Sequence, residues 1–157
     1  MFQDGSIHGV LSRPIRRFTD SRGWLSELFR QDELDPRFYP VMAYISMTLP
    51  GVVRGPHEHR DQADYFCFIG PSEFKLYLWD SRRDSPTYGK RHALVAGTDR
   101  PQSVIVPIGV VHAYKNIGTE PGIVFNCPNR LYAGWGKREP VDEIRHEDEA
   151  GMEYLLW

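Results

Sequence analysis

The sequence predicts an all-β protein built from many short strands, and three observations support this. Its 12 Pro and 14 Gly divide the chain into short segments. The segments between them are rich in β-branched and aromatic residues, as strands are. No long amphipathic helix is visible, and only Gln31–Phe38 is expected to form a short helical turn. Many short strands separated by turn residues are typical of a sandwich or a barrel.

The clearest predicted strand is Phe74–Trp79. Its residues Phe74, Leu76 and Leu78 fall on one face and the residues between them on the other. This is the period of two that a strand requires. The other predicted strands are Val41–Thr48, Asp64–Ile69, Ser103–Val106, His112–Asn116 and Ile123–Cys127.

Length and composition limit the classes of protein that the chain can belong to. The 157 residues predict one domain that spans residues 1–157. A net charge of -2 gives no electrostatic argument for binding nucleic acid or an anionic membrane. Arg outnumbers Lys among the 19 basic residues, and the guanidinium group suits a phosphorylated small molecule. We expect a cytoplasmic protein, since no segment approaches the ~20 apolar residues of a membrane span and the N-terminus has no signal-peptide pattern.

Two other features have ordinary structural interpretations. Cys67 and Cys127 each lie in an apolar run, which predicts buried free thiols rather than a disulfide. The strongly acidic tail Val141–Ala150 is expected to be a solvated surface segment, apart from Asp148, which is discussed below.

Two segments carry residues that can do chemistry. The first places His57, His59 and Asp64 in the spacing Gly-x5-His-x-His-x4-Asp. The second, Pro107–Asn116, reads Pro-x-Gly-x-x-His-x-x-x-Asn and contains His112. Residues i and i+2 of a strand point to the same face, so His57 and His59 can point into a barrel together. We expect Asp64, after a turn, and His112, from a distant strand, to complete one pocket.

Both segments resemble the two sequence motifs of the cupins, with Asp64 in place of the usual Glu. The resemblance implies a cupin-type double-stranded β-helix, a jelly-roll barrel with few short helices. Three imidazoles and a carboxylate can hold a first-row divalent metal with open coordination positions. His57, His59, Asp64 and His112 are therefore candidate metal ligands. The alternative is that the histidines act as bases without any metal.

Further motifs follow one another in a recognisable order over most of the chain. They are Asp20–Glu27 (Asp-x-Arg-Gly-x-x-x-Glu), Val53–His57 (Val-Arg-Gly-Pro-His), Asp80–Arg82 with Ser85–Gly89 (Asp-x-Arg, then Ser-Pro-Thr-Tyr-Gly), Pro107–Tyr114, and Ile144–Asp148 (Ile-Arg-His-Glu-Asp). In this order and spacing they resemble the dTDP-4-dehydrorhamnose 3,5-epimerases and their nucleotide-sugar relatives, a family of cupins.

The resemblance implies an isomerase of the epimerase class. Such enzymes abstract protons next to the C4 ketone of a dTDP-linked deoxysugar and return them from the other face. By position the base is His57, oriented by the carboxylate of Asp148, and His112 belongs to the same catalytic set. The implied substrate contacts are Arg22, Glu27, Arg54, Gln62 and Tyr44, with arginines holding the pyrophosphate. The resemblance also implies a homodimer formed by exchange of N-terminal strands, and no required cofactor.

The chain departs from the family pattern at positions that matter for catalysis. Asp64 replaces the Lys that stabilises the enolate oxygen, and a carboxylate there would repel the developing charge. Phe125 aligns with the general-acid Tyr, and Tyr132, seven residues on, is the candidate substitute. His59 replaces a Gln, while Met42 and Tyr44 replace a Gln and an Asn.

Two of these departures occur together, because His59 and Asp64 both turn family positions into cupin metal-ligand positions. The hypothesis is that this branch exchanged an ammonium group for a divalent metal, which would polarise the ketone as a Lewis acid.

Three other functions stay open at this level. One is a 3,4-ketoisomerase, which moves a ketone instead of inverting a carbon. Another is a metal-dependent cupin of a different reaction class that uses His57, His59, Asp64 and His112. The last is a non-catalytic cupin that binds a sugar nucleotide.

Overall fold

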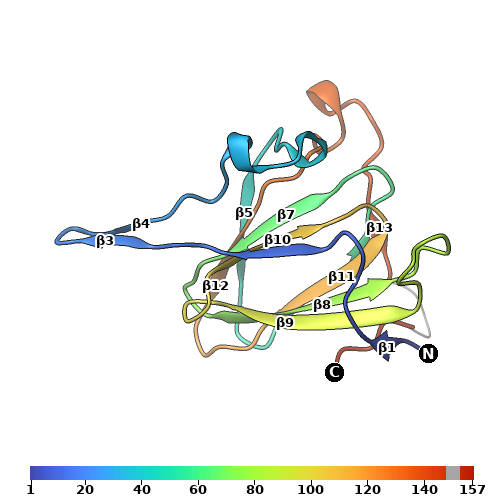
Figure 1. Ribbon diagram of the computed structural model, residues 1–157, viewed down its shortest axis with the longest axis horizontal. Helices are drawn as coiled ribbons and strands as arrows, with labels where there is room; N and C mark the ends of the chain where they lie inside the picture. The colour runs from blue at the N-terminus through green and yellow to red at the C-terminus, as the bar shows by residue number, and fades with distance from the viewer. Residues whose placement is uncertain (148–152) are drawn as a thin grey trace.

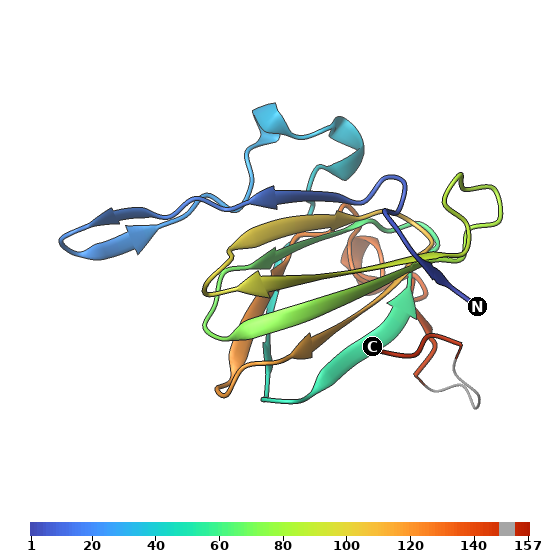
Figure 2. The same cartoon turned by 60° about the horizontal axis from the view of Figure 1, so that its bottom comes forward.

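The computed structural model describes residues 1–147 and 153–157, and their strands form two facing sheets (Figure 1). One sheet has six strands in the order β1-β9-β8-β11-β6-β13, and the other has five in the order β2-β10-β7-β12-β5. All pairs within these sheets are antiparallel except β1 with β9. A two-stranded hairpin, β3-β4, projects away from both sheets (Figure 2).

The strands are β1 (Gln3–Asp4), β2 (Leu11–Pro14), β3 (Phe18–Asp20), β4 (Gly23–Leu25), β5 (Tyr44–Thr48), β6 (Val53–Glu58), β7 (Asp64–Phe68), β8 (Glu73–Asp80), β9 (Lys90–Gly97), β10 (Gln102–Val106), β11 (Val110–Asn116), β12 (Gly122–Asn126) and β13 (Ile144–Arg145). The helical elements among the described residues are three short 3₁₀ helices: η1 (Gln31–Glu33), η2 (Pro36–Phe38) and η3 (Trp135–Lys137). The predicted all-β barrel with few short helices is confirmed.

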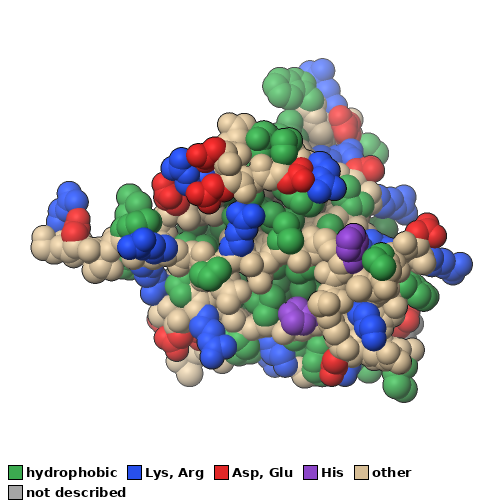
Figure 3. Space-filling view, viewed as in Figure 1, with side chains coloured by type: hydrophobic (Ala, Val, Ile, Leu, Met, Phe, Trp, Pro, Cys, Tyr) green, Lys and Arg blue, Asp and Glu red, His purple; other side chains and the backbone are tan. Residues whose placement is uncertain are grey.

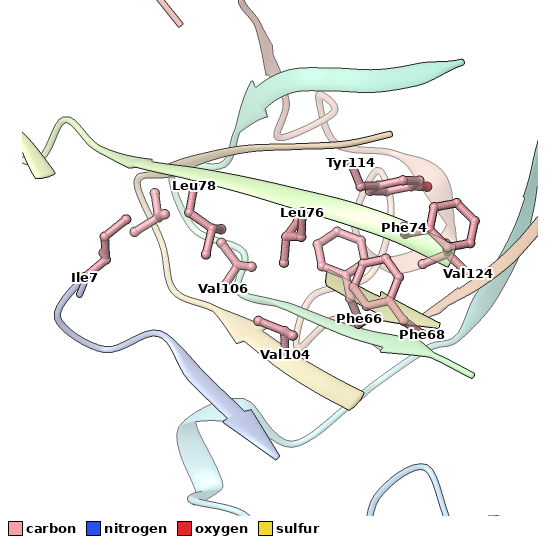
Figure 4. Packing of buried hydrophobic residues seen from close by; sticks show 12 residues of the cluster. Ile7, Phe66, Phe68, Phe74, Leu76, Leu78, Val104, Val106, Tyr114 and Val124 are labelled. Carbon is pink, nitrogen blue, oxygen red and sulfur yellow. The ribbon is translucent and has the colours of Figure 1, made fainter. Parts of the chain in front are cut away.

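The core lies between the two sheets and follows the alternation read from the sequence. Phe74, Leu76 and Leu78 of β8 face the interior cluster, where they meet Phe66 and Phe68 of β7 (Figure 4). The intervening Tyr77 and Trp79 pack in a separate cluster on the outer face of the same sheet. Burial of such aromatic and aliphatic side chains contributes roughly 1.5–3 kcal/mol each.

Each of the six predicted strands is present, with ends that differ from the prediction by at most three residues. Strand β9 was not predicted, because its segment Lys90–Gly97 begins with three polar residues and most of its side chains are only partly covered. Gln31–Phe38 forms two 3₁₀ turns instead of one, since Pro36 starts a second turn capped by the side chain of Asp35.

Cys67 and Cys127 are buried free thiols, as expected. Acidic and basic side chains are interspersed on the face of the molecule drawn in Figure 3. Among residues 1–147 and 153–157, no helix has both the length and the apolar character needed to cross a bilayer. The single-domain organisation and the cytoplasmic location stay predictions.

The family motifs Asp80–Arg82 and Ser85–Gly89 form the turn between β8 and β9. The fully buried carboxylate of Asp80 accepts hydrogen bonds from Arg82 Nε at 2.8 Å, from Ser85 Oγ at 2.6 Å and from Thr87 Oγ1 at 2.6 Å. Burial opposes ionisation, but these donors hold the pKa of Asp80 at about 2. These motif residues therefore stabilise the fold at a turn.

The replacement Asp80→Asn is expected to lower the free energy of unfolding by about 2 kcal/mol, because an amide leaves part of this donor set unpaired. The pKa of Asp80 is lower in the folded than in the unfolded chain. The carboxylate therefore stabilises the protein fully above about pH 4, and this contribution is lost as the pH falls towards 2. Urea unfolding at pH 7 and pH 3 measures both effects. Asp84→Asn, at an exposed position of the same turn, is the control, and an equal loss in both variants would contradict the assignment.

Candidate active site between the two sheets

Strands β6 and β11 bring the two histidine segments together. His57 of β6 lies directly opposite His112 of β11, and their ring centroids are 4.4 Å apart. Gly55 makes this approach possible: its φ is +87°, and a Cβ there would lie 2.6 Å from the carbonyl oxygen of His112. The glycine of the Arg-Gly-x-His segment is thus required by the close contact between these two strands.

His59 and Asp64 complete the cluster. His59 follows the last residue of β6, and Asp64 is the first residue of β7 in the opposite sheet. The Oδ2 atom of Asp64 lies 3.1 Å from His59 Nε2 and 3.0 Å from His112 Nε2. One ligand atom from each of His57, His59, Asp64 and His112 lies within 4.8 Å of the others. The structure therefore brings together the four residues that the spacing singled out.

Amide side chains hold the other oxygen of Asp64. Its Oδ1 accepts hydrogen bonds from Gln62 Nε2 at 2.7 Å and from Asn126 Nδ2 at 2.9 Å. Asp64 and Asn126 are each only 1% exposed. The orientation of the carboxylate is therefore fixed, with Oδ2 directed at the imidazoles.

The backbone fixes the tautomers of two histidines. His112 Nδ1 lies 3.0 Å from the carbonyl oxygen of Val110, and His59 Nδ1 contacts the carbonyl oxygen of Asp142. A carbonyl oxygen can only accept, so each Nδ1 carries the proton and each neutral ring presents the lone pair of Nε2. Two lone pairs then meet the Oδ2 atom of Asp64, and both Oδ2 and His112 Nε2 are buried without a well-formed hydrogen bond.

The two Nε2 lone pairs and the Oδ2 atom of Asp64 repel one another unless a positive charge lies between them. This charge can be an added proton or a bound cation. Burial would lower the pKa of His59, but the hydrogen bond and charge of Asp64 raise it to about 9. Burial raises the pKa of Asp64, but His112 and His59 outweigh this and hold it well below its usual range. Burial and the two neighbouring imidazoles lower the pKa of His57 to about 2. His57 is therefore a neutral imidazole.

Two cavities meet at the cluster. One, of about 370 Å³, is lined by His57, His59, Tyr44, Arg54 and Tyr114, among others. The second, of about 390 Å³, shares His59 and Tyr44 and continues to Gln62, Tyr132 and Lys137. Both volumes are in the range of small-molecule sites.

Four other predicted residues lie around these cavities: Arg54, Gln62, Tyr44 and Tyr132. Two do not. Arg22 lies at the tip of the β3-β4 hairpin, 87% exposed and paired with Asp20, because the hairpin projects away from the barrel. Glu27 follows this hairpin and lines a separate cavity with Arg13 and Arg30. Asp148 lies outside the described residues.

Sequence reasoning missed Asn126 and Asp142. Strand β12 turns Phe125 to the outer face, against the cluster around Cys67, and turns Asn126 inward. The signal in the sequence was the alternation of the strand: Val124 is an apolar residue that faces the interior, so Asn126, two residues on, faces the interior as well. The acidic tail was expected to be solvated, but Ile144–Arg145 forms β13 beside β6, and the carboxylate of Asp142 accepts hydrogen bonds from the backbone amides of Arg60 and Asp61. Sheet pairing therefore brings this segment to the site.

Two facing sheets with three histidines and a carboxylate converging between them define the protein as a cupin. Comparison with solved structures supports this fold. The dTDP sugar isomerase from Desulfovibrio desulfuricans G20 superposes with a TM-score of 0.79, with 21% identity over 94% of this chain and 87% of the other. A double mutant of ChmJ, a 3'-monoepimerase from Streptomyces bikiniensis in complex with dTDP, gives a TM-score of 0.76, with 24% identity over 92% of this chain and 72% of the other.

Sequence comparisons place the chain more narrowly. The family model described as dTDP-4-dehydrorhamnose 3,5-epimerase matches residues 4–150. A Haloferax volcanii protein named "Probable low-salt glycan biosynthesis epimerase Agl13" is 40% identical over 129 residues, 81% of each chain. The Bacillus subtilis spore coat polysaccharide biosynthesis protein SpsL is 32% identical over 115 residues, 73% of this chain and 75% of its own. The chain belongs to the dTDP-4-dehydrorhamnose 3,5-epimerase family and is a nucleotide-sugar epimerase-like enzyme.

Proposed function

We propose that the enzyme epimerises a dTDP-linked 4-keto-6-deoxysugar, with His57 as the base. The observation that carries the proposal is the position of His57, which lines a cavity of about 370 Å³ together with Tyr44 and Arg54. In the proposed step His57 takes the proton from a carbon next to the C4 ketone, and the electron pair moves onto the C4 oxygen to give an enolate. Return of a proton to the other face of that carbon inverts it.

Charged side chains on the same cavity supply binding for the nucleotide. Arg54 and Arg145 both line the cavity that contains His57, and guanidinium groups bind phosphate oxygens in a bidentate manner. Arg54 is held in place because its Nε donates to Thr48 Oγ1 at 2.9 Å and its NH2 donates to the carbonyl oxygen of Met47 at 2.8 Å. We assign the pyrophosphate to this side of the cavity, and contacts with the sugar to Gln62 and Tyr44.

Arg22 and Glu27 lie away from the cavity of their own chain, so they can contact a substrate only in the cavity of a second copy of the chain. The β3-β4 hairpin exposes Trp24 and Leu25, and the edge strand β5 exposes Ile45 and Met47. Unpaired strand edges and apolar patches of this kind favour association. A homodimer that pairs such surfaces would bring the hairpin of one chain towards the other. We also propose that the carboxylate of Asp148 orients His57, as the sequence predicts.

Solvent exchange tests the proposal directly. Incubation of the enzyme with a dTDP-4-keto-6-deoxysugar in deuterium oxide is expected to incorporate deuterium next to the ketone, seen by NMR as loss of the corresponding proton signal. An inverted centre in the product separates epimerisation from 3,4-ketoisomerisation, which would move the ketone instead. Nucleotide binding without exchange would contradict catalysis and assign the chain to the non-catalytic binders.

A divalent metal is the second candidate, because it would supply the charge that the family's Lys provides elsewhere. The donor set fits: two imidazoles with their Nε2 lone pairs directed inward, the buried Oδ2 of Asp64, and His57 beside them. Carbonyl oxygens behind the two Nδ1 atoms are the usual outer support of metal-binding histidines. A bound metal would polarise the ketone. Metal analysis of protein purified without an affinity tag, with thermal shifts on adding Zn, Mn, Fe or Ni, tests this assignment. No metal and no shift would leave protonated His59 as the source of positive charge.

A further inference from the structure

An epimerase needs a proton donor on the side of the substrate opposite its base, and β12 does not supply one here. Phe125, the residue aligned with the family's Tyr, faces away from the cavities. Asn126, which faces inward, has no acidic proton. The donor must therefore come from another element of the cavity wall.

Tyr44 of β5 occupies the position next to this gap. In the antiparallel pair of β5 and β12, Tyr44 lies directly opposite Asn126. The Tyr44 hydroxyl is 2.9 Å from Asn126 Nδ2. Tyr44 lines both cavities together with His59, and it lines the first of them with His57. It comes from the five-stranded sheet, whereas His57 comes from the six-stranded sheet. The two side chains thus face the cavity from opposite walls.

The hydrogen bonds around Asn126 leave the Tyr44 proton available. Asn126 Oδ1 accepts a bond from the backbone amide of Tyr65 at 3.0 Å, which fixes the orientation of the side-chain amide. The two protons on Nδ2 then go to Asp64 Oδ1 and to the Tyr44 oxygen, each at 2.9 Å. The Tyr44 oxygen therefore accepts at this contact, and its own O–H points to a different partner. Desolvation and the charge of Asp64 raise the pKa of Tyr44, so the hydroxyl keeps its proton at neutral pH.

The other two cavity tyrosines are less suited to the role. The Tyr114 hydroxyl is engaged with Ser46 Oγ at 2.9 Å. Of the two cavities, Tyr132 lines only the one that does not contain His57. Tyr44 is the cavity tyrosine whose hydroxyl is both positioned by a buried partner and placed across from the base.

We propose that Tyr44 is the catalytic acid of this enzyme, and that it donates its hydroxyl proton to the substrate carbon on the face opposite His57. This inference rests on the proposed epimerase function. The O–H bond of Tyr44 breaks as the new C–H bond forms, and the enolate electron pair returns to carbon. The resulting tyrosinate then recovers a proton from solvent in the cavity, and the protonated His57 releases the proton that it took from the substrate to solvent. In this proposal the catalytic acid is a residue of β5, whereas the family's Tyr aligns with Phe125 of the neighbouring strand β12.

The test compares exchange with inversion in the variant Tyr44→Phe. Without the acid, His57 can still remove a proton and return a deuteron to the same face. Tyr44→Phe is therefore expected to incorporate deuterium into unreacted dTDP-4-keto-6-deoxysugar at close to the wild-type rate, while formation of inverted product falls at least about 100-fold. Tyr88→Phe, at an exposed turn outside both cavities, is expected to match the wild type. Thermal unfolding and dTDP binding check that Tyr44→Phe is folded.

Each outcome decides between the two proposals. Inverted product from Tyr44→Phe at the wild-type rate, or a comparable loss in Tyr132→Phe alone, overturns the role of Tyr44 and leaves the epimerase function standing. A wild-type enzyme with neither exchange nor product overturns both. If Tyr44→Phe does not fold, fluorotyrosine at position 44 replaces it as the test. The lower pKa of that phenol is expected to move the alkaline limb of the rate profile to lower pH, and an unmoved limb overturns the proposal.

Discussion

Replacing His57 with Asn is expected to lower kcat at least about 1,000-fold, the upper part of the range for loss of a positioned general base. Asn has a size similar to that of the imidazole but no basic nitrogen. His57 is half-buried on the cavity wall beside two other imidazoles, and burial and these neighbours lower its pKa, so the ring is neutral and has a free nitrogen lone pair. The loss is expected in kcat rather than KM, because Arg54 and the rest of the cavity wall stay in place. Both exchange and inversion are expected to disappear, in contrast to Tyr44→Phe.

The matched control is His92→Asn, at an exposed position of β9, which is expected to leave kcat and KM unchanged. Rates of deuterium exchange and of product formation, measured with dTDP binding by calorimetry, give the comparison. Exchange at the wild-type rate in folded His57→Asn would show that another group is the base.

The second large effect concerns the carboxylate of Asp64, and it depends on the substitute. Asp64→Ala is expected to lower the free energy of unfolding by about 3–5 kcal/mol, the range for removing one partner of a buried charge pair. Asp64→Asn is expected to stay within about 1 kcal/mol of the wild type. Its amide oxygen can take the place of Oδ1, with Gln62 and Asn126 as donors. Its amide nitrogen can then donate one proton to each Nε2 of His59 and His112, which lie 3.1 and 3.0 Å from the present Oδ2.

The same pair of variants reports on metal. An amide is a poor metal ligand beside a carboxylate, so any rise in Tm on adding Zn, Mn, Fe or Ni is expected in the wild type and not in Asp64→Asn. Chemical unfolding gives the stabilities, and thermal scans with and without metal give the shift. An equal shift in both proteins would place the metal elsewhere. A destabilisation of Asp64→Asn as large as that of Asp64→Ala would contradict the tautomers assigned to His59 and His112.

Much of the fold could be predicted because it depends on local patterns. The alternation in Phe74–Trp79 gave the two faces of β8, and each predicted strand is present. Strand β9 and the hairpin were not predicted, because most residues of β9 are only partly buried, those of β3 and β4 are exposed, and both segments carry a weak apolar pattern.

The sequence by itself determined the family, through the order of its motifs, and it determined the cluster of His57, His59, Asp64 and His112. Side chains two residues apart in a strand point to the same face, so the spacing of the histidines already indicated that they point into the barrel. The tertiary structure decided what surrounds that cluster. The register of β5 against β12 turns Asn126 and Tyr44 inward and Phe125 outward, and the pairing of β13 with β6 brings Asp142 behind His59. These contacts join residues about 80 positions apart, and their register is set by packing across the barrel, which no local pattern encodes.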